Sequence, residues 1–179
     1  LQTPLFRKGF IRPIKGGRIS SVFGSQRILK GIPKNMHNGL DIAVPRGTPV
    51  LAMADAVVNL TTDNFYYAGN YIVLDHGQGL NSMYLHLSEI LVEEGQRVNK
   101  GDVIGKVGTT GRSTGPHLHW GVQWYSKRID PEHILNIKTQ EPVISSINPA
   151  TKGLIIAANI PILPDIPTSD PVYFGPKSA

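Results

Sequence analysis

Short stretches in which apolar residues run together or alternate with polar ones follow one another along the chain from Ser20 onward. Glycine, proline and asparagine separate these stretches, a pattern typical of β-strands joined by turns. The predicted strands cover residues 50–60, 71–75, 82–86, 103–107 and 118–124. Their spacing predicts an antiparallel, all-β core.

One short helix is expected near the end of this region. Asp130 suits an N-cap, Pro131 suits the first helical position, and residues 132–135 continue the helix. The predicted fold class is therefore all-β, with an antiparallel sheet bent into a sandwich or half-open barrel and few short helices.

Composition divides the chain of 179 residues into three parts. Residues 1–17 form a basic N-terminal arm, and residues 18–137 form the main domain. Residues 138–179 form a C-terminal tail that holds seven of the 14 prolines and no histidine. At most one strand-like run, residues 154–160, is expected in this tail.

The hydrophobic content of 40% predicts a globular protein, and no apolar run approaches the roughly 20 residues of a membrane-spanning helix. No leader is visible at Leu1, so a leader is expected to have been removed or left out. Cysteine is absent, and any metal site must therefore use imidazole and carboxylate ligands.

The net charge of +5 is distributed unevenly, because residues 1–34 carry eight Lys or Arg and no acid. A basic segment favours anionic partners, such as a cell-wall or envelope surface. Nucleic acid is not expected as a partner, since no aromatic residues interleave with these charges and no helix suits a groove.

Two histidine motifs carry the candidate chemistry. His37 and Asp41 are four residues apart in a Gly- and Pro-rich segment, which predicts a turn that runs into a strand. His117 and His119 are two apart, so a strand presents both on one face, and Leu118 faces the other way. The pattern predicts a zinc site in which one histidine of the second pair is left without a metal bond.

With these motifs the chain resembles the lysostaphin/LytM-type zinc metallopeptidases, which cut peptidoglycan. The likeness covers roughly residues 18–135, and its segments are residues 18–24, His37-Asn-Gly-Leu-Asp41, residues 47–50, 54–58 and 69–77, Tyr84-Leu-His86, residues 95–101 and 111–120. Ala56 and Gly121 depart from the family pattern, where glycine and an acidic residue are common. Neither position supplies a ligand.

The resemblance implies that His37, Asp41 and His119 bind one Zn²⁺, and that His86 and His117 are catalytic. Three protein ligands leave a fourth position for water, whose pKa zinc can lower towards ~7. His117, His86 or both would accept its proton. The implied function is hydrolysis of peptide bonds in peptidoglycan, in cross-links or stem peptides, by an enzyme of the periplasm, cell envelope or extracellular space.

Other readings stay open beside this one. A non-catalytic LytM-type regulator would bind and activate a cell-wall amidase, but such relatives typically lose ligands or catalytic histidines that this chain keeps. Tyr84 is expected to pack in the core, with a bond to the reacting oxyanion as the alternative. His76 is assigned to a hairpin turn and His133 to the surface. The loops 61–68 and 111–116 are expected to set specificity.

Overall fold

The computed structural model describes residues 1–29 and 31–137. The tail 138–179 and its strand-like run therefore lie outside the described residues. Contacts divide the described residues into two units, one of residues 1–25 and 37–137 and one of residues 26–36. No helix in the described part of the chain is long and apolar enough to span a bilayer.

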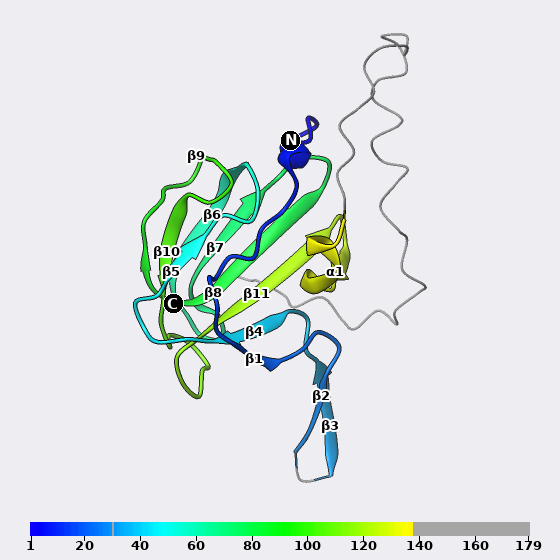
Figure 1. Ribbon diagram of the computed structural model, residues 1–179. Helices are drawn as coiled ribbons and strands as arrows, with labels where there is room; N and C mark the ends of the chain where they lie inside the picture. Colours follow the sequence, from blue (N-terminus) through cyan, green and yellow to red (C-terminus); the bar gives the residue numbers. More distant parts are fainter. Residues whose placement is uncertain (30, 138–179) are drawn as a thin grey trace, which may run out of the picture. The chain divides into compact units, whose positions relative to one another are not determined.

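The larger unit is built on one antiparallel sheet, which confirms the predicted fold class. Its strands are β1 (Arg18–Ser21), β4 (Leu40–Ala43), β5 (Pro49–Leu51), β6 (Ala56–Phe65), β7 (Gly69–Asp75), β8 (Leu80–Ile90), β9 (Arg97–Val98), β10 (Val103–Val107), β11 (His117–Trp124) and β12 (Lys127–Ile129). Figure 1 shows β4, β11, β8 and β7 as neighbours. The spatial order is β1-β4-β11-β8-β7-β6-β9.

The long strand β8 bends the sheet into a half-open shape. Its first half pairs with β11, and its second half pairs with β10, which also pairs with β5. The change of partner comes at an irregularity, because Tyr84 pairs with Ile72 of β7 whereas Leu87 pairs with Asn70. His86 lies in this bulge with a φ of 64°, in the left-handed region.

Large apolar side chains from both sides of the bend fill one core. The face of β11 that carries Leu118, Trp120 and Val122 is fully buried, as are Ile72 and Leu74 of β7. This burial stabilises the sheet by roughly 2 kcal/mol for each large side chain. The opposite face of β11 is thereby left for polar chemistry.

The predicted helix is present as α1 (Pro131–Leu135), and the Asp130 side chain accepts a hydrogen bond from the Glu132 N–H at 3.0 Å. A 3₁₀ turn, η1 (Phe6–Lys8), lies in the N-terminal segment. Phe6 and Ile14 are buried in the core, so residues 1–17 pack on the sheet.

The single predicted strand 50–60 is two strands, β5 and β6, because the chain between them leaves the ladder to enter the core at Ala52, Met53 and Ala54. The smaller unit is a hairpin that the sequence pattern did not predict, with strands β2 (Gln26–Leu29) and β3 (Ile32–Met36). Its apolar residues Ile28 and Ile32 are exposed, so they do not alternate with polar residues as the apolar residues of a buried face would.

Candidate active site

Asp41 and His119 lie directly opposite each other on neighbouring strands. Asp41 of β4 is the register partner of His119 of β11, and directly opposite residues project to the same face. The Asp41 Oδ1 atom is 2.8 Å from His119 Nδ1. The pairing of two strands 78 residues apart therefore builds half of the site.

His37 completes the cluster from the loop before β4. The His37 N–H donates to the Ser25 carbonyl and the His37 carbonyl accepts from the Gly24 N–H, both at 2.8 Å, which fixes the loop. His37 Nε2 is 3.0 Å from Asp41 Oδ1 and 3.0 Å from His119 Nδ1. Three atoms of metal-ligand type thus converge on one point.

The chemistry of these three atoms fits a cation. His37 Nδ1 faces the Val22 carbonyl at 3.0 Å, and since a carbonyl only accepts, Nδ1 carries the hydrogen. His37 Nε2 then presents a lone pair towards a carboxylate oxygen. Metal-binding histidines typically donate their other ring N–H to a carbonyl or carboxylate in this way. The group His37, Asp41 and His119 could hold a metal ion.

The charge of Asp41 is favoured by its neighbours. Burial raises the pKa of this carboxyl, but hydrogen bonds and charge from His119 and His37 outweigh burial and hold the pKa well below its usual value. Asp41 is therefore ionised at neutral pH, as a metal ligand must be.

Gly39 allows the close packing of this cluster. A Cβ at Gly39 would lie 2.6 Å from His119 Nε2 and 2.7 Å from the Trp120 carbonyl oxygen. No other residue fits there without displacing the His119 ring. The sequence shows a glycine between His37 and Asp41, but the need for glycine there comes from the His119 ring, which only the folded chain brings close.

His86 and His117 lie beside the cluster without joining it. Their ring centroids are 4.7 Å apart, and the His86 ring is 6.2 Å from that of His119. His117 Nε2 is 3.9 Å from Asp41 Oδ1, longer than the ligand-atom distances within the cluster. The structure thus brings all five predicted site residues together and separates them into three and two.

Both rings of this second group are held in the same way, through a hydrogen bond at Nδ1. His86 Nδ1 donates to the Thr110 carbonyl at 2.9 Å, and His117 Nδ1 donates to the Gly115 carbonyl at 2.8 Å. Each Nε2 is therefore the nitrogen with a lone pair, and can accept a proton. Burial, together with the neighbouring His117 and His119, lowers the pKa of His86 to about 4, so His86 is neutral at pH 7.

The two loops expected to set specificity meet beside His86. The Ala68 carbonyl accepts from the His86 N–H at 2.9 Å, and the Arg112 N–H donates to the Tyr67 carbonyl at 3.0 Å. The Arg112 guanidinium also lies 5.9 Å from the centroid of the Tyr67 ring. Every residue has a backbone carbonyl, so the residue types could not indicate that these carbonyls would be the acceptors.

The remaining candidates lie elsewhere. Tyr84 is fully buried, accepts from the Met53 N–H at 3.1 Å and from the Ser82 hydroxyl at 3.0 Å, and burial raises its pKa to about 12. It is a core residue, as the default reading predicted. His76 is buried just before the turn, and the side chain of His133 is exposed.

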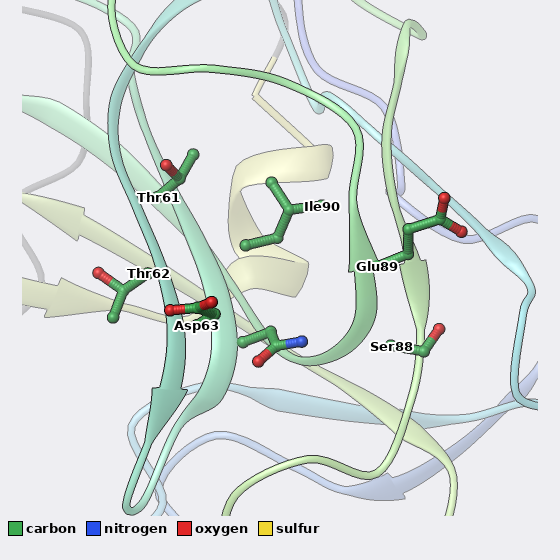
Figure 2. Close-up of a pocket in the computed structure, with 7 residues that line it drawn as sticks. Thr61, Thr62, Asp63, Ser88, Glu89 and Ile90 are labelled. Carbon is green, nitrogen blue, oxygen red and sulfur yellow. The ribbon is translucent and has the colours of Figure 1, made fainter.

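A hollow of about 520 Å³ lies over β6, β7 and the end of β8 and has no histidine in its lining (Figure 2). Its lining is mostly polar and consists of Thr61, Thr62, Asp63, Asn70, Ser88, Glu89 and Ile90. It contains none of the five site residues. The chemistry of the site comes from the histidine groups and not from this hollow.

Comparison with known proteins assigns the family. The model of peptidase family M23 matches residues 35–131, more than half of the chain. The chain belongs to peptidase family M23. The matched range contains His37, Asp41, His86, His117 and His119.

Named relatives agree with this assignment. Over 105 residues the chain is 52% identical to the peptidoglycan DD-endopeptidase ShyA of Vibrio cholerae, a match that covers 58% of this chain and 24% of that protein. The chain spans about a quarter to a third of the length of the curated relatives it matches.

Solved structures of M23 peptidases share the fold. A zinc-containing peptidase from Vibrio cholerae is 34% identical with a TM-score of 0.65, covering 78% of this chain and 41% of that one. The catalytic domain of lysostaphin from Staphylococcus simulans is 31% identical with a TM-score of 0.60, covering 68% of this chain and 93% of that domain. The lysostaphin-like likeness predicted from the motifs is confirmed.

Proposed function

We propose that this chain is a zinc-dependent endopeptidase that hydrolyses peptide bonds in peptidoglycan, in cross-links or stem peptides. The observation that carries the proposal is the convergence of His37 Nε2, Asp41 Oδ1 and His119 Nδ1 within 3.0 Å of one another beside two further imidazoles. The M23 relatives named as peptidoglycan DD-endopeptidases support the choice of substrate.

His37, Asp41 and His119 would hold one Zn²⁺ per chain. When bound, zinc supplies a Lewis acid that polarises a carbonyl and lowers the pKa of water. The donor set of two imidazoles and one carboxylate suits zinc, and a relative of the same fold is described as zinc-containing.

His86 and His117 would handle protons and charge. Each presents a lone pair at Nε2, and each is held at Nδ1 by a backbone carbonyl. In this proposal one imidazole accepts the proton of the attacking water at Nε2, and the imidazolium so formed donates this N–H in a hydrogen bond to the oxyanion. The pKa of His86, held low by burial, favours the neutral ring as the proton acceptor.

The regulator reading is less favoured because all five residues are present and oriented. A regulator needs neither a lone pair at two Nε2 atoms nor a three-atom cluster. The proposal has three further parts. The chain acts in the periplasm or cell envelope, and its basic segment 1–17 is attracted to an anionic envelope surface. The chain is divided into an arm (1–17), a peptidase domain (18–137) and a tail (138–179).

Digestion of purified peptidoglycan tests the proposal. We expect the zinc-loaded chain to release soluble muropeptides, and a chelator to stop the release until zinc is added back. Mass spectrometry of the products identifies the bond. Amidase activation by a zinc-loaded chain that digests no wall preparation would instead establish the regulator.

A further inference from the structure

The face of β11 that carries His117 and His119 continues to Gly121 and Gln123. Two residues along a strand span about 7 Å, so Gly121 lies one such step from the metal cluster. Met83 of β8 is the register partner of Gly121, and Arg128 of β12 is the partner of Gln123. Since opposite residues project to the same face, Arg128 lies on the histidine face of the sheet.

Gly121 leaves room for the Arg128 guanidinium beside the site. A Cβ at Gly121 would lie 3.4 Å from Arg128 Nη1, 3.6 Å from Met83 Cε and 3.8 Å from the Asn38 carbonyl oxygen. Asn38 follows His37 directly in the chain. A guanidinium, a thioether and the backbone beside a proposed zinc ligand thus surround one point on the face.

Within residues 1–29 and 31–137, no carboxylate lies close enough to the Arg128 guanidinium to form a salt bridge. Its Nη1 donates to Met83 Sδ at 2.7 Å, and a thioether is a weak acceptor. Burial lowers the pKa of Arg128, yet an arginine stays protonated in proteins. A half-buried cation with so weak a partner is suited to accept an anion.

We propose that Arg128 binds a free carboxylate of the substrate, on the residue that supplies the amine side of the scissile bond. The inference rests on the proposed function and specifies its substrate. In a DD cross-link that ends on the D-centre of diaminopimelate, this residue carries a free α-carboxylate next to the scissile nitrogen. A glycine bridge carries none.

The spacing along the sheet is compatible with this placement. The scissile carbonyl carbon and the carboxylate carbon are three bonds apart, which is at most about one Cα–Cα step of 3.8 Å. This step and a hydrogen bond of about 3 Å together cover the roughly 7 Å that separate His119 from Gly121 along β11. The planar fork of an arginine matches a carboxylate with two parallel hydrogen bonds, which fixes the direction of the bound peptide.

Two cross-linked muropeptide dimers test the proposal, identical except that this diaminopimelate carboxylate is free in one and a carboxamide in the other. The zinc-loaded wild-type chain is expected to cleave the free acid with a kcat/KM roughly 10–100-fold higher, the range for a charge-assisted hydrogen bond. Arg128→Gln should reduce the free-acid value about 10–100-fold and the carboxamide value by less than about threefold, because the charge-assisted hydrogen bond forms only with the free acid.

Arg128→Lys is the matched control, because it keeps the charge and the aliphatic stem but lacks the fork, and should retain part of the selectivity. Zinc content and melting temperature are measured for each variant. Equal losses on both dimers, or no loss on either, would overturn the role of Arg128. If the wild-type chain cleaves neither dimer, the proposed function itself fails, and Arg128 has no such substrate.

Discussion

At the scale of single residues, three of the four site histidines have Nδ1 fixed by a backbone carbonyl. Backbone carbonyls of Val22, Thr110 and Gly115 fix Nδ1 of His37, His86 and His117. The sequence predicted the five residue types, but which nitrogen of each ring is available depends on carbonyl positions that no residue type encodes.

Gly39→Ala should disturb the metal cluster while leaving all five functional residues in the chain. The added Cβ would lie 2.6 Å from His119 Nε2, so the ring or the loop must move. We expect zinc affinity to fall at least tenfold and stability to fall by about 1–3 kcal/mol. Competition with a zinc chelator and urea unfolding measure the two effects.

Gly115→Ala is the control for this substitution. Gly115 also lies beside a site histidine, but a Cβ there meets nothing within 4 Å. Its zinc affinity and stability should match the wild type. Equal zinc affinities for the Gly39 and Gly115 variants would contradict the packing argument.

His76 should make the fold sensitive to mild acid. The buried ring donates from Nδ1 to the Asp55 carbonyl at 3.0 Å, and its Nε2 lies 2.7 Å from the Ser82 hydroxyl oxygen. Burial lowers the pKa of His76 from 6.5 to about 4. Between these pH values the unfolded chain binds a proton that the folded chain does not. Stability should therefore fall as the pH drops from 6.5 to 4, by up to about 3 kcal/mol.

Urea unfolding of the wild type and His76→Gln at several pH values, in the presence of chelator, measures this effect. The variant is expected to be less stable at pH 7.5 but to lose less stability on acidification. Identical dependence on pH in the two proteins would show that His76 is not the group responsible.

At the scale of elements, the bulge in β8 positions His86. Strand alternation alone would place Tyr84 and His86 on one face, yet Tyr84 is in the core and His86 is in the site. The φ of 64° at His86 makes this possible. Strict alternation along a strand does not predict a bulge, which changes the face on which His86 lies. The role of His86 therefore came from the family resemblance and not from periodicity.

His86→Gly should be more stable than His86→Ala. Glycine adopts a positive φ without the penalty of a Cβ, which for other residues is about 1–2 kcal/mol. Both variants remove the imidazole and should lack turnover. Thermal unfolding is expected to give a melting temperature roughly 2–8 °C higher for glycine. A lower value for glycine would contradict strain at this position.

The strands themselves were predictable where one face is buried. Apolar residues in 103–107 and 118–124 predicted two such strands, and the observed bounds of β10 and β11 agree with these ranges to within one residue. Residues 26–36 do not, because Ile28 and Ile32 of this hairpin are exposed and therefore indicate no buried face. The register of Asp41 against His119 joins strands distant in sequence, so it follows from the whole sheet and not from either strand.

At the scale of the whole molecule, the bent sheet buries one face of β11 and leaves the other to hold the site. The metal cluster joins β4, β11 and the loop before β4, so metal binding should stabilise the folded chain. Zinc at about 100 times its dissociation constant should add roughly 2.7 kcal/mol to the free energy of unfolding. Asp41→Ala should abolish this gain, and an equal gain in that variant would place the ion elsewhere.

The division of the histidines into metal ligands and catalytic groups is tested by zinc content measured beside turnover of peptidoglycan. His86→Ala and His117→Ala should each retain one zinc per chain and lose turnover. His119→Ala should lose both zinc and turnover. Loss of zinc from the His117 variant with turnover retained, or one tightly bound zinc in the His119 variant, would contradict the division.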